Sequence, residues 1–261
     1  MSDILFTIAE NKRREVEALF GSSSRPRFNH DKMWLKPVYS MSQRIKEVKG
    51  GIIAEFKRRS PSKGDIFPMA DVAQIVPQYL EHGAAGCSVL TDTRFFGGSS
   101  ADLAVAQTLS QEMPLLRKDF IISKIQIDEA RALGASAVLL IAAILTKEEL
   151  KEFHEHAHYH KMETLVEIHE VKELDKITFQ PDMLGVNNRN LSSFHTDVRH
   201  SFELVNALPK EWLLIAESGI KSPEDINRLK NVGFKGFLIG EAFMSTAHPG
   251  ETLKKFIDAI Q

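Results

Sequence analysis

Residues 51–57 read Gly51-Ile52-Ile53-Ala54-Glu55-Phe56-Lys57, a short apolar run that ends in charged residues. Similar runs of four to six residues, rich in Ile, Val and Leu, recur along the chain. Short apolar runs bounded by polar segments are typical of strands that are buried on both faces of a parallel sheet. The sequence predicts eight such strands, at residues 52–56, 86–90, 115–118, 136–141, 163–166, 183–187, 212–216 and 235–239.

Each predicted strand is followed by a stretch with the apolar spacing of an amphipathic helix. The predicted helices span 70–81, 101–111, 124–133, 146–159, 169–177, 198–207, 222–231 and 250–260, and the fifth has the weakest pattern. Alternating strands and helices imply right-handed crossovers and a parallel sheet. Eight units in about 210 residues fit a closed (β/α)8 TIM barrel. An open doubly wound sheet fits less well, because no Gly-rich dinucleotide-binding turn follows the first strand.

The residues before position 50 differ from this repeating pattern. Residues 3–19 have helical spacing, with Asp3 as the expected N-cap, and residues 44–49 form a second short charged stretch of helical character. We therefore expect two parts: an N-terminal helical extension over residues 1–49, packed on the barrel, and the barrel itself over residues 50–261.

The composition excludes several classes of protein. The 33 Lys and Arg are balanced by 35 Asp and Glu and interspersed with them, so we expect no nucleic-acid partner. No apolar run approaches the length of a membrane span, and the N-terminus lacks the apolar segment of a signal peptide. The single cysteine, Cys87, excludes an intramolecular disulfide and fits a reducing cytoplasm. No exposed apolar stripe stands out, so a monomer is favoured over a homodimer.

Charged residues lie at the carboxyl ends of five predicted strands, where the active sites of (β/α)8 barrels are found. Residues two apart in a strand share a face. If these faces point inward, one cavity gathers Glu55, Lys57, Lys118, Glu167, Asn187, Arg189 and Glu217. Three carboxylates would pair with three cations, which keeps buried lysines charged and suits proton transfer to an anionic substrate. The alternative is that each strand simply ends in a polar residue at the solvent.

Glycines close the last two predicted strands, in Glu217-Ser218-Gly219 and Ile239-Gly240-Glu241. Barrels often bind phosphate at these two loops through backbone N–H groups. A single glycine there is weak evidence, because glycine also serves tight turns. Two of them, in these two loops, predict an anion site.

Several motifs together resemble the indole-3-glycerol phosphate synthase family. Glu55-Phe56-Lys57-Arg58-Arg59-Ser60-Pro61-Ser62 resembles the first-strand signature of that family. The resemblance continues through residues 90–92, 95–99, 116–122, 165–167, 185–191, 216–220 and 238–241. It covers essentially the whole chain, including a helical extension before the first strand.

The resemblance implies a (β/α)8 barrel that converts 1-(2-carboxyphenylamino)-1-deoxyribulose 5-phosphate to indole-3-glycerol phosphate. Carbon dioxide and water are lost, and the reaction is a lyase step of tryptophan biosynthesis. The resemblance also implies that neither a metal nor an organic cofactor takes part.

By position in these motifs, Lys118 matches the family's general acid, which protonates the ketone as the aromatic carbon attacks it. An ammonium group can neutralise the alkoxide charge that develops there. Glu55 and Glu167 match catalytic carboxylates, and Lys57 matches a lysine that pairs with a carboxylate and holds the substrate. The resemblance leaves open which lysine protonates the leaving hydroxyl. It further implies substrate contacts from Ser60, Phe96, Phe120, Asn187, Arg189 and Glu217, and phosphate contacts from Ser218, Gly219, Gly240 and Glu241.

Three other functions remain alternatives. Another phosphate-binding barrel, such as a phosphoribosyl isomerase, would share the glycine loops but would not predict the first-strand signature. A non-catalytic binding barrel would not need converging acids and bases. His154-Glu155-His156-Ala157-His158 matches the H-E-x-x-H pattern of zinc proteases, in which His154 and His158 share a helix face beside Glu155. This segment, however, lies on a polar, histidine-rich helix that is expected on the outer surface.

Overall fold

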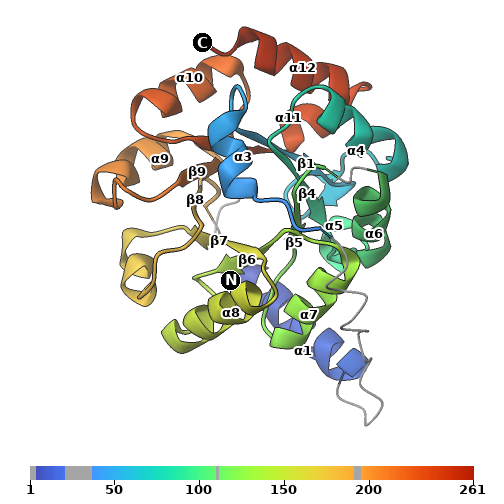
Figure 1. Cartoon of the computed structure of the whole chain (residues 1–261), viewed down its shortest axis with the longest axis vertical. Coiled ribbons are helices and arrows are strands. Elements are labelled where there is room, and N and C mark those ends of the chain that lie inside the picture. The colour runs from blue at the N-terminus through green and yellow to red at the C-terminus, as the bar shows by residue number, and fades with distance from the viewer. Residues whose placement is uncertain (1–3, 21–36, 110–111, 191–194) are drawn as a thin grey trace.

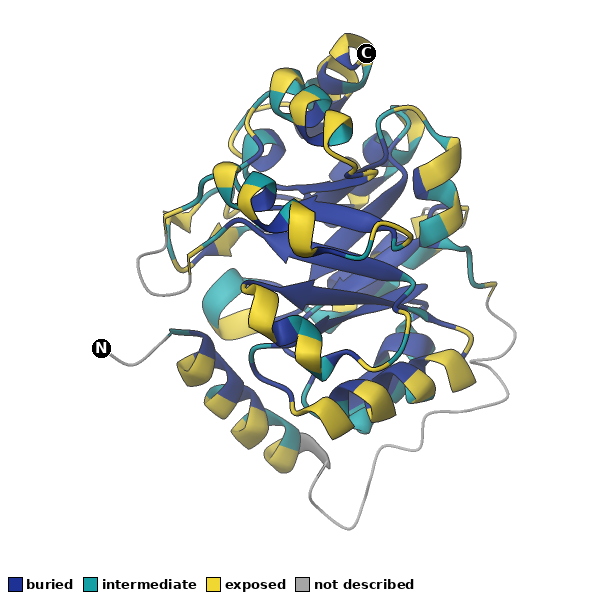
Figure 2. Cartoon of the chain, turned by 90° about the vertical axis from the view of Figure 1, so that its left-hand side faces the viewer, coloured by how far each residue is buried: buried dark blue, intermediate teal, exposed yellow. Residues whose placement is uncertain are grey.

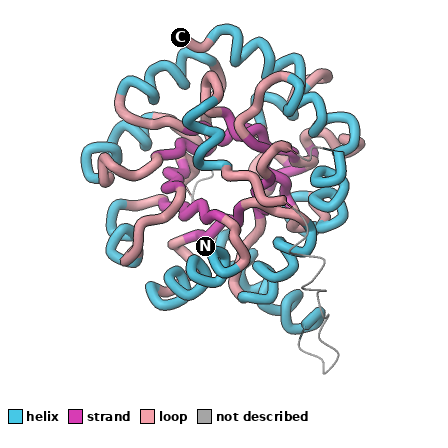
Figure 3. The backbone as a smooth tube through the Cα atoms, in the orientation of Figure 1, coloured by secondary structure: helices cyan, strands magenta, loops and turns pink. Residues whose placement is uncertain are grey.

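The computed structural model describes residues 4–20, 37–109, 112–190 and 195–261. Eight parallel strands close into a barrel, and helices surround it (Figures 1 and 3). The strands, in order around the barrel, are β1 (Ile52–Phe56), β4 (Gly86–Leu90), β5 (Leu115–Lys118), β6 (Ala137–Ile141), β7 (Glu163–Ile168), β8 (Met183–Asn187), β9 (Leu214–Glu217) and β10 (Gly236–Ile239). Strand β10 pairs back with β1 and closes the barrel. The predicted (β/α)8 fold is confirmed.

The strands are almost entirely buried, as the dark blue centre of Figure 2 shows. The outer layer contains α4 (Val72–Glu81), α6 (Ser100–Leu109), α7 (Lys124–Leu133), α8 (Lys147–Tyr159), α9 (Arg199–Leu204), α10 (Pro223–Asn231) and α12 (Pro249–Ala259). Polar caps determine where several helices begin; Thr146 and Glu149, for example, form a capping box at the start of α8. Among the described residues, no helix is long and apolar enough to cross a bilayer.

The fifth predicted helix is the main difference from the expected elements. Residues 171–176 form a 3-10 helix, η1 (Val171–Lys176), in which Glu173 is the buried residue. Without a buried apolar stripe, this segment lacks the packing that stabilises a longer α-helix. The predicted sixth helix is divided between α9 and a second 3-10 helix, η2 (Val205–Ala207).

Strand boundaries and short elements also differ from the expectation. Strand β9 begins at Leu214 rather than at 212, and β7 continues to Ile168. The sequence patterns missed a hairpin of β2 (Arg59–Ser60) and β3 (Gly64–Asp65) and two single-turn helices, α5 (Thr93–Phe96) and α11 (Glu241–Met244). These elements are too short to show a periodic pattern.

The N-terminal region contributes two helices, α1 (Ile4–Phe20) and α3 (Met41–Glu47). The predicted cap Asp3 lies outside the described residues. Helix α3 begins three residues earlier than expected, where Ser40 caps it. Glu163, at the start of β7, accepts hydrogen bonds from the backbone N–H groups of Met41 and Ser42. These bonds attach α3 to the amino-terminal end of the barrel.

Candidate active site

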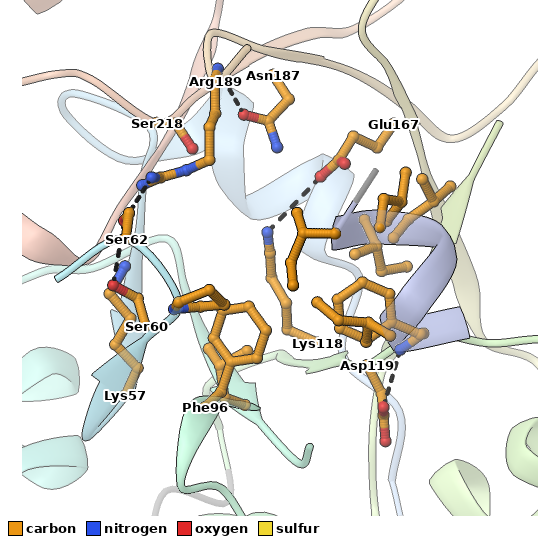
Figure 4. Close-up of a pocket in the computed structure, with 18 of the residues that line it drawn as sticks. Lys57, Ser60, Ser62, Phe96, Lys118, Asp119, Glu167, Asn187, Arg189 and Ser218 are labelled. Carbon is orange, nitrogen blue, oxygen red and sulfur yellow. Dashed lines mark hydrogen bonds and ion pairs between the residues drawn. The ribbon is translucent and has the colours of Figure 1, made fainter. Parts of the chain in front are cut away.

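A cavity at the carboxyl ends of the strands gathers most of the charged residues predicted to converge (Figure 4). The parallel register puts these side chains on one side of the sheet: Glu167 of β7 pairs with Gly185 of β8, two residues before Asn187, and Asn187 pairs with Glu217 of β9. Residues of one parity therefore face the barrel axis on neighbouring strands, as expected. The cavity is lined by Glu55, Lys57, Lys118, Glu167, Asn187 and Arg189. Glu217 is not among the lining residues but contacts Lys118.

Lys118 lies at the centre of three buried carboxylates. Its Nζ is 3.2 Å from Glu217 Oε2, 3.7 Å from Glu167 Oε2 and 3.9 Å from Glu55 Oε2. Burial alone would lower the pKa of Lys118, but the three carboxylates outweigh it and raise that pKa above its usual value. Lys118 is therefore held as an ammonium ion that can donate a proton.

Lys57 and Glu55 form a second pair beside this cluster. Lys57 Nζ is 2.6 Å from Glu55 Oε1, and both side chains are buried. Burial would raise the pKa of Glu55, but the charges of Lys57 and Lys118 lower it below its ordinary value. Glu55 is thus an ionised carboxylate that faces two ammonium groups.

Two glycines allow the carboxylates to approach the barrel wall. A Cβ atom at Gly185 would overlap with Glu217 Oε1, and a Cβ atom at Gly240 would overlap with Glu55 Oε1. Any larger residue would displace a carboxylate from Lys118 or from Lys57. Gly240 therefore has a role in the charged cluster as well as its place in the predicted phosphate loop.

Glu217 is a carboxyl group whose pKa lies well above that of an ordinary glutamate. Complete burial raises its pKa to about 8; Lys118 opposes this shift, and the neighbouring charge of Glu167 adds to it. A carboxyl group with this pKa can hold or release a proton near neutral pH. The cluster thus combines an ammonium donor, an ionised acceptor and a carboxyl group that titrates near neutrality.

We expect Glu217→Gln to flatten the pH dependence of stability. Folding raises the pKa of Glu217 from 4.5 to about 8, so the folded state holds a proton that the unfolded chain releases across this window. The free energy of unfolding of the wild type therefore falls as the pH rises through the window. Urea midpoints at about pH 5 and about pH 9 should show a larger drop for the wild type than for the variant. Equal drops would contradict the upward shift.

The cavity walls divide into an aromatic side and a polar side. The rings of Phe96 and Phe120 lie 5.9 Å apart between centroids and tilted by 36°. On the other side, Arg189 Nη1 donates a 2.6 Å hydrogen bond to Ser62 Oγ, and Ser60 lies next to Ser62 (Figure 4). This arrangement can hold a planar aromatic group against the rings and a carboxylate or hydroxyl group against the polar wall.

A second cavity adjoins the first and contains the predicted phosphate residues. Lys57, Lys118 and Arg189 line both cavities. Ser218 and Gly219 have φ values of 65° and 75°, two consecutive left-handed residues, of which only the glycine adopts this conformation without strain. The lining includes Ser218, Gly219, Gly240 and Glu241, together with Lys221.

The model of one protein family, indole-3-glycerol phosphate synthase, matches residues 5–256. The chain belongs to this family. It is 48% identical to the indole-3-glycerol phosphate synthase of Bacteroides thetaiotaomicron over the full length of both chains. It is 43% identical to that of Bacillus cereus strain G9842, with 95% of each chain covered. The family suggested by the first-strand signature is thereby confirmed.

Two solved structures share the barrel at low sequence identity. Thiamine phosphate pyrophosphorylase from Pyrococcus furiosus has a TM-score of 0.58 and 16% identity, covering 82% of this chain and 97% of that one. A mutant tryptophan synthase α-subunit from the same organism has a TM-score of 0.58 and 15% identity, covering 81% and 97%. At this identity, the likeness shows the fold alone.

The structure adds site residues to those that the family resemblance led us to expect. His169 lines the cavity, and its Nε2 is 3.5 Å from Glu167 Oε1. It lies two residues after Glu167, so the same parity argument could have identified it. Lys221, in the phosphate cavity, follows the Ser-Gly loop and could have been found as a nearby cation. Ser62, in the first-strand signature, is a further site residue, because Arg189 donates a hydrogen bond to its hydroxyl.

Helix α1 also reaches the cavity, which no local pattern indicates. Leu5 and Ile8 line the cavity. Further along the helix, Lys12 Nζ lies 3.1 Å from Asp92 Oδ2 and 3.0 Å from Asp119 Oδ1. Burial would lower the pKa of Lys12, but these carboxylates raise it. A buried lysine thus connects α1 to the strand ends that carry the site.

The H-E-x-x-H segment does not form a protease site. His154 and His158 share a face of α8, as expected, with ring centroids 4.1 Å apart. However, His154 stacks on Phe179, and its Nδ1 bonds Thr164 Oγ1 at 2.8 Å. Glu155 is 64% exposed and pairs with Lys151, so it does not face the two histidines as a general base would.

Proposed function

We propose that this chain converts 1-(2-carboxyphenylamino)-1-deoxyribulose 5-phosphate to indole-3-glycerol phosphate, carbon dioxide and water. The observation that carries the proposal is the Lys118 ammonium group, buried within 4 Å of three carboxylates at the floor of a cavity with an aromatic wall. Membership of the indole-3-glycerol phosphate synthase family supports this lyase activity and its place in tryptophan biosynthesis.

In the ring-closing step, the aromatic carbon attacks the ketone of the substrate, and negative charge develops on the ketone oxygen. Lys118 donates its proton to that oxygen, where a preorganised cation stabilises the transition state in a site of low dielectric. Carbon dioxide then leaves, and the electrons of the broken C–C bond restore the aromatic ring.

The dehydration step needs an acid for the departing hydroxyl and a base for the proton that is removed. Two ammonium groups, those of Lys57 and Lys118, line the cavity, so an acid is present for each of the two protonations. Glu55 and Glu167 are the carboxylates assigned to proton removal. The low pKa of Glu55 supports its role as a base that is ionised before the reaction begins.

The remaining residues bind the two ends of the substrate. Phe96 and Phe120 are assigned to the aromatic ring, and Ser60, Asn187 and Arg189 to the substrate carboxylate and the ribulose hydroxyls. Glu217, for which the family resemblance implies a substrate contact, is 1% exposed and outside both cavity linings, so we assign it a role through Lys118. The phosphate is assigned to the adjoining cavity, through Ser218, Gly219, Gly240 and the backbone N–H of Glu241.

We further propose that residues 1–49 are an extension of a barrel over residues 50–261, which acts as a cytoplasmic monomer. The contacts of Leu5, Ile8 and Lys12 with the site support a role for the extension in covering the substrate. Within the part of the chain that the structure describes, the exposed large apolar side chains are scattered, with only Val105 and Leu109 on one helix, which supports the monomer. They are Phe6, Met69, Val105, Leu109, Tyr159, Val171 and Val232.

The activity can be tested with purified protein in buffer that contains a metal chelator. We expect the carboxyphenylamino-deoxyribulose phosphate to be converted to a product with indole fluorescence. The ribosylamine isomer of the same substrate serves as the control, because a phosphoribosyl isomerase would act on it while this site should not. A folded sample that isomerises the control, or that leaves the substrate unchanged, would contradict the proposal.

A further inference from the structure

Two histidines and an aspartate converge between two outer helices of the barrel, away from the charged cavity. His156 and His160 lie one turn apart at the end of α8, and Asp128 faces them from α7. Each histidine Nε2 is 2.7 Å from the same atom, Asp128 Oδ1. The three candidate ligand atoms all lie within 4.8 Å of one another.

We propose that Asp128, His156 and His160 form a binding site for one divalent transition-metal ion of the zinc type. Two imidazole nitrogens and one carboxylate oxygen are the ligand types that such ions prefer. With metal–ligand bonds of about 2.0–2.1 Å, tetrahedral geometry places ligand atoms about 3.4 Å apart. The present 2.7 Å contacts would therefore lengthen by less than about 1 Å as the ion binds between Asp128 Oδ1 and the two Nε2 atoms, with each neutral imidazole keeping its proton on Nδ1.

The backbone around this site holds the ligands in place. The side chain of His160 is 1% exposed. His160 is also the C-cap of α8, and its backbone N–H donates hydrogen bonds to carbonyl groups in the last turn of that helix. Asp128 is flanked on α7 by buried Ile127 and Ala130, so the helix that carries it is packed against the barrel. A helix C-terminus also favours a bound cation.

One coordination position remains open to solvent. The side chains of Asp128 and His156 are 20% and 23% exposed, so a water molecule can complete a four-coordinate ion. The three ligands come from two neighbouring helices, α7 and α8. The expected consequence of binding is a cross-link between these outer helices, which would stabilise the folded chain.

A neighbouring cluster on the same helix provides the internal comparison. His154, His158 and Asp182 also lie within 4.8 Å of one another. There, however, Asp182 Oδ2 accepts a hydrogen bond from the backbone N–H of Thr164, and His154 Nδ1 bonds the Thr164 hydroxyl. A metal ion in this second cluster would compete with contacts that hold β7, so we assign the ion to the first.

The test uses protein purified without a histidine tag and stripped of metal with a chelator. Zinc is then titrated in competition with a chromophoric indicator, and cobalt is added separately to report tetrahedral coordination by its visible absorption. We expect one equivalent to bind to the wild type and to raise the thermal midpoint. Asp128→Asn and His156→Asn, both at partly exposed positions, should each weaken zinc binding by at least about tenfold and reduce the rise in midpoint at the same zinc concentration.

His158→Asn is the matched control, because it removes one histidine from the second cluster on the same helix, and it should leave the affinity unchanged. Circular dichroism checks that each variant is folded. The proposal is overturned if the wild type binds no zinc at micromolar concentration, if Asp128→Asn and His156→Asn bind zinc as the wild type does, or if only His158→Asn loses it. These measurements do not involve the lyase reaction, so their outcome is independent of the proposed function.

Discussion

Replacing Lys118 with alanine should lower kcat by at least about 100-fold, the effect expected from losing a positioned general acid. Lys118 is the ammonium group nearest to Glu217 and Glu167, and those carboxylates keep it protonated. Alanine also leaves the three carboxylates without their shared cation, so part of the loss would come from altered charges in the cluster.

Lys118→Arg separates these two contributions. Arginine keeps the positive charge among the carboxylates but does not release a proton in the pH range of the assay. If proton donation is the role of Lys118, kcat should fall by a similar factor of about 100 or more while KM changes much less. Lys124→Ala, which removes a half-buried lysine that pairs with Glu152 at the start of α7, is the matched control and should retain activity. Near-normal kcat in both Lys118 variants would assign ketone protonation to Lys57.

Glu167→Gln should also lower kcat by about 100-fold or more, because glutamine keeps the shape of the side chain but cannot accept a proton. Glu167 is 3% exposed and lies between Lys118 and His169. Loss of its charge should also lower the pKa of Glu217, since the Glu167 carboxylate contributes to raising it. The rate of indole formation across pH values measures both effects.

Glu170→Gln is the control for this change. Glu170 lies three residues further along the chain, is 59% exposed, and pairs with Lys172 at the surface. Its replacement should leave kcat near that of the wild type. If the kcat of Glu167→Gln equals that of Glu170→Gln, Glu167 has no catalytic role.

The barrel itself was predictable from local patterns. Strand β1 and the strands that follow are apolar runs with period-two faces, and the helices between them have period-3.6 faces, so each element carries its own signal. The same alternation placed Glu55, Lys118 and Glu167 on one side of their strands. The family signature after β1 then supplied the expected roles. Elements without a buried apolar face, such as η1, were predicted with the wrong type or length.

The distances that turn these residues into a site could not be predicted from local patterns. The approach of Lys118 to three carboxylates, and the raised pKa of Glu217, depend on strands that lie far apart in the chain and meet only when the barrel closes. The contacts of Lys12 with Asp92 and Asp119 likewise arise where α1 packs against the strand ends. Periodicity determines which face of a strand a residue occupies, because it acts within one element. Burial and charge pairing act between elements, and only the closed barrel brings those elements together.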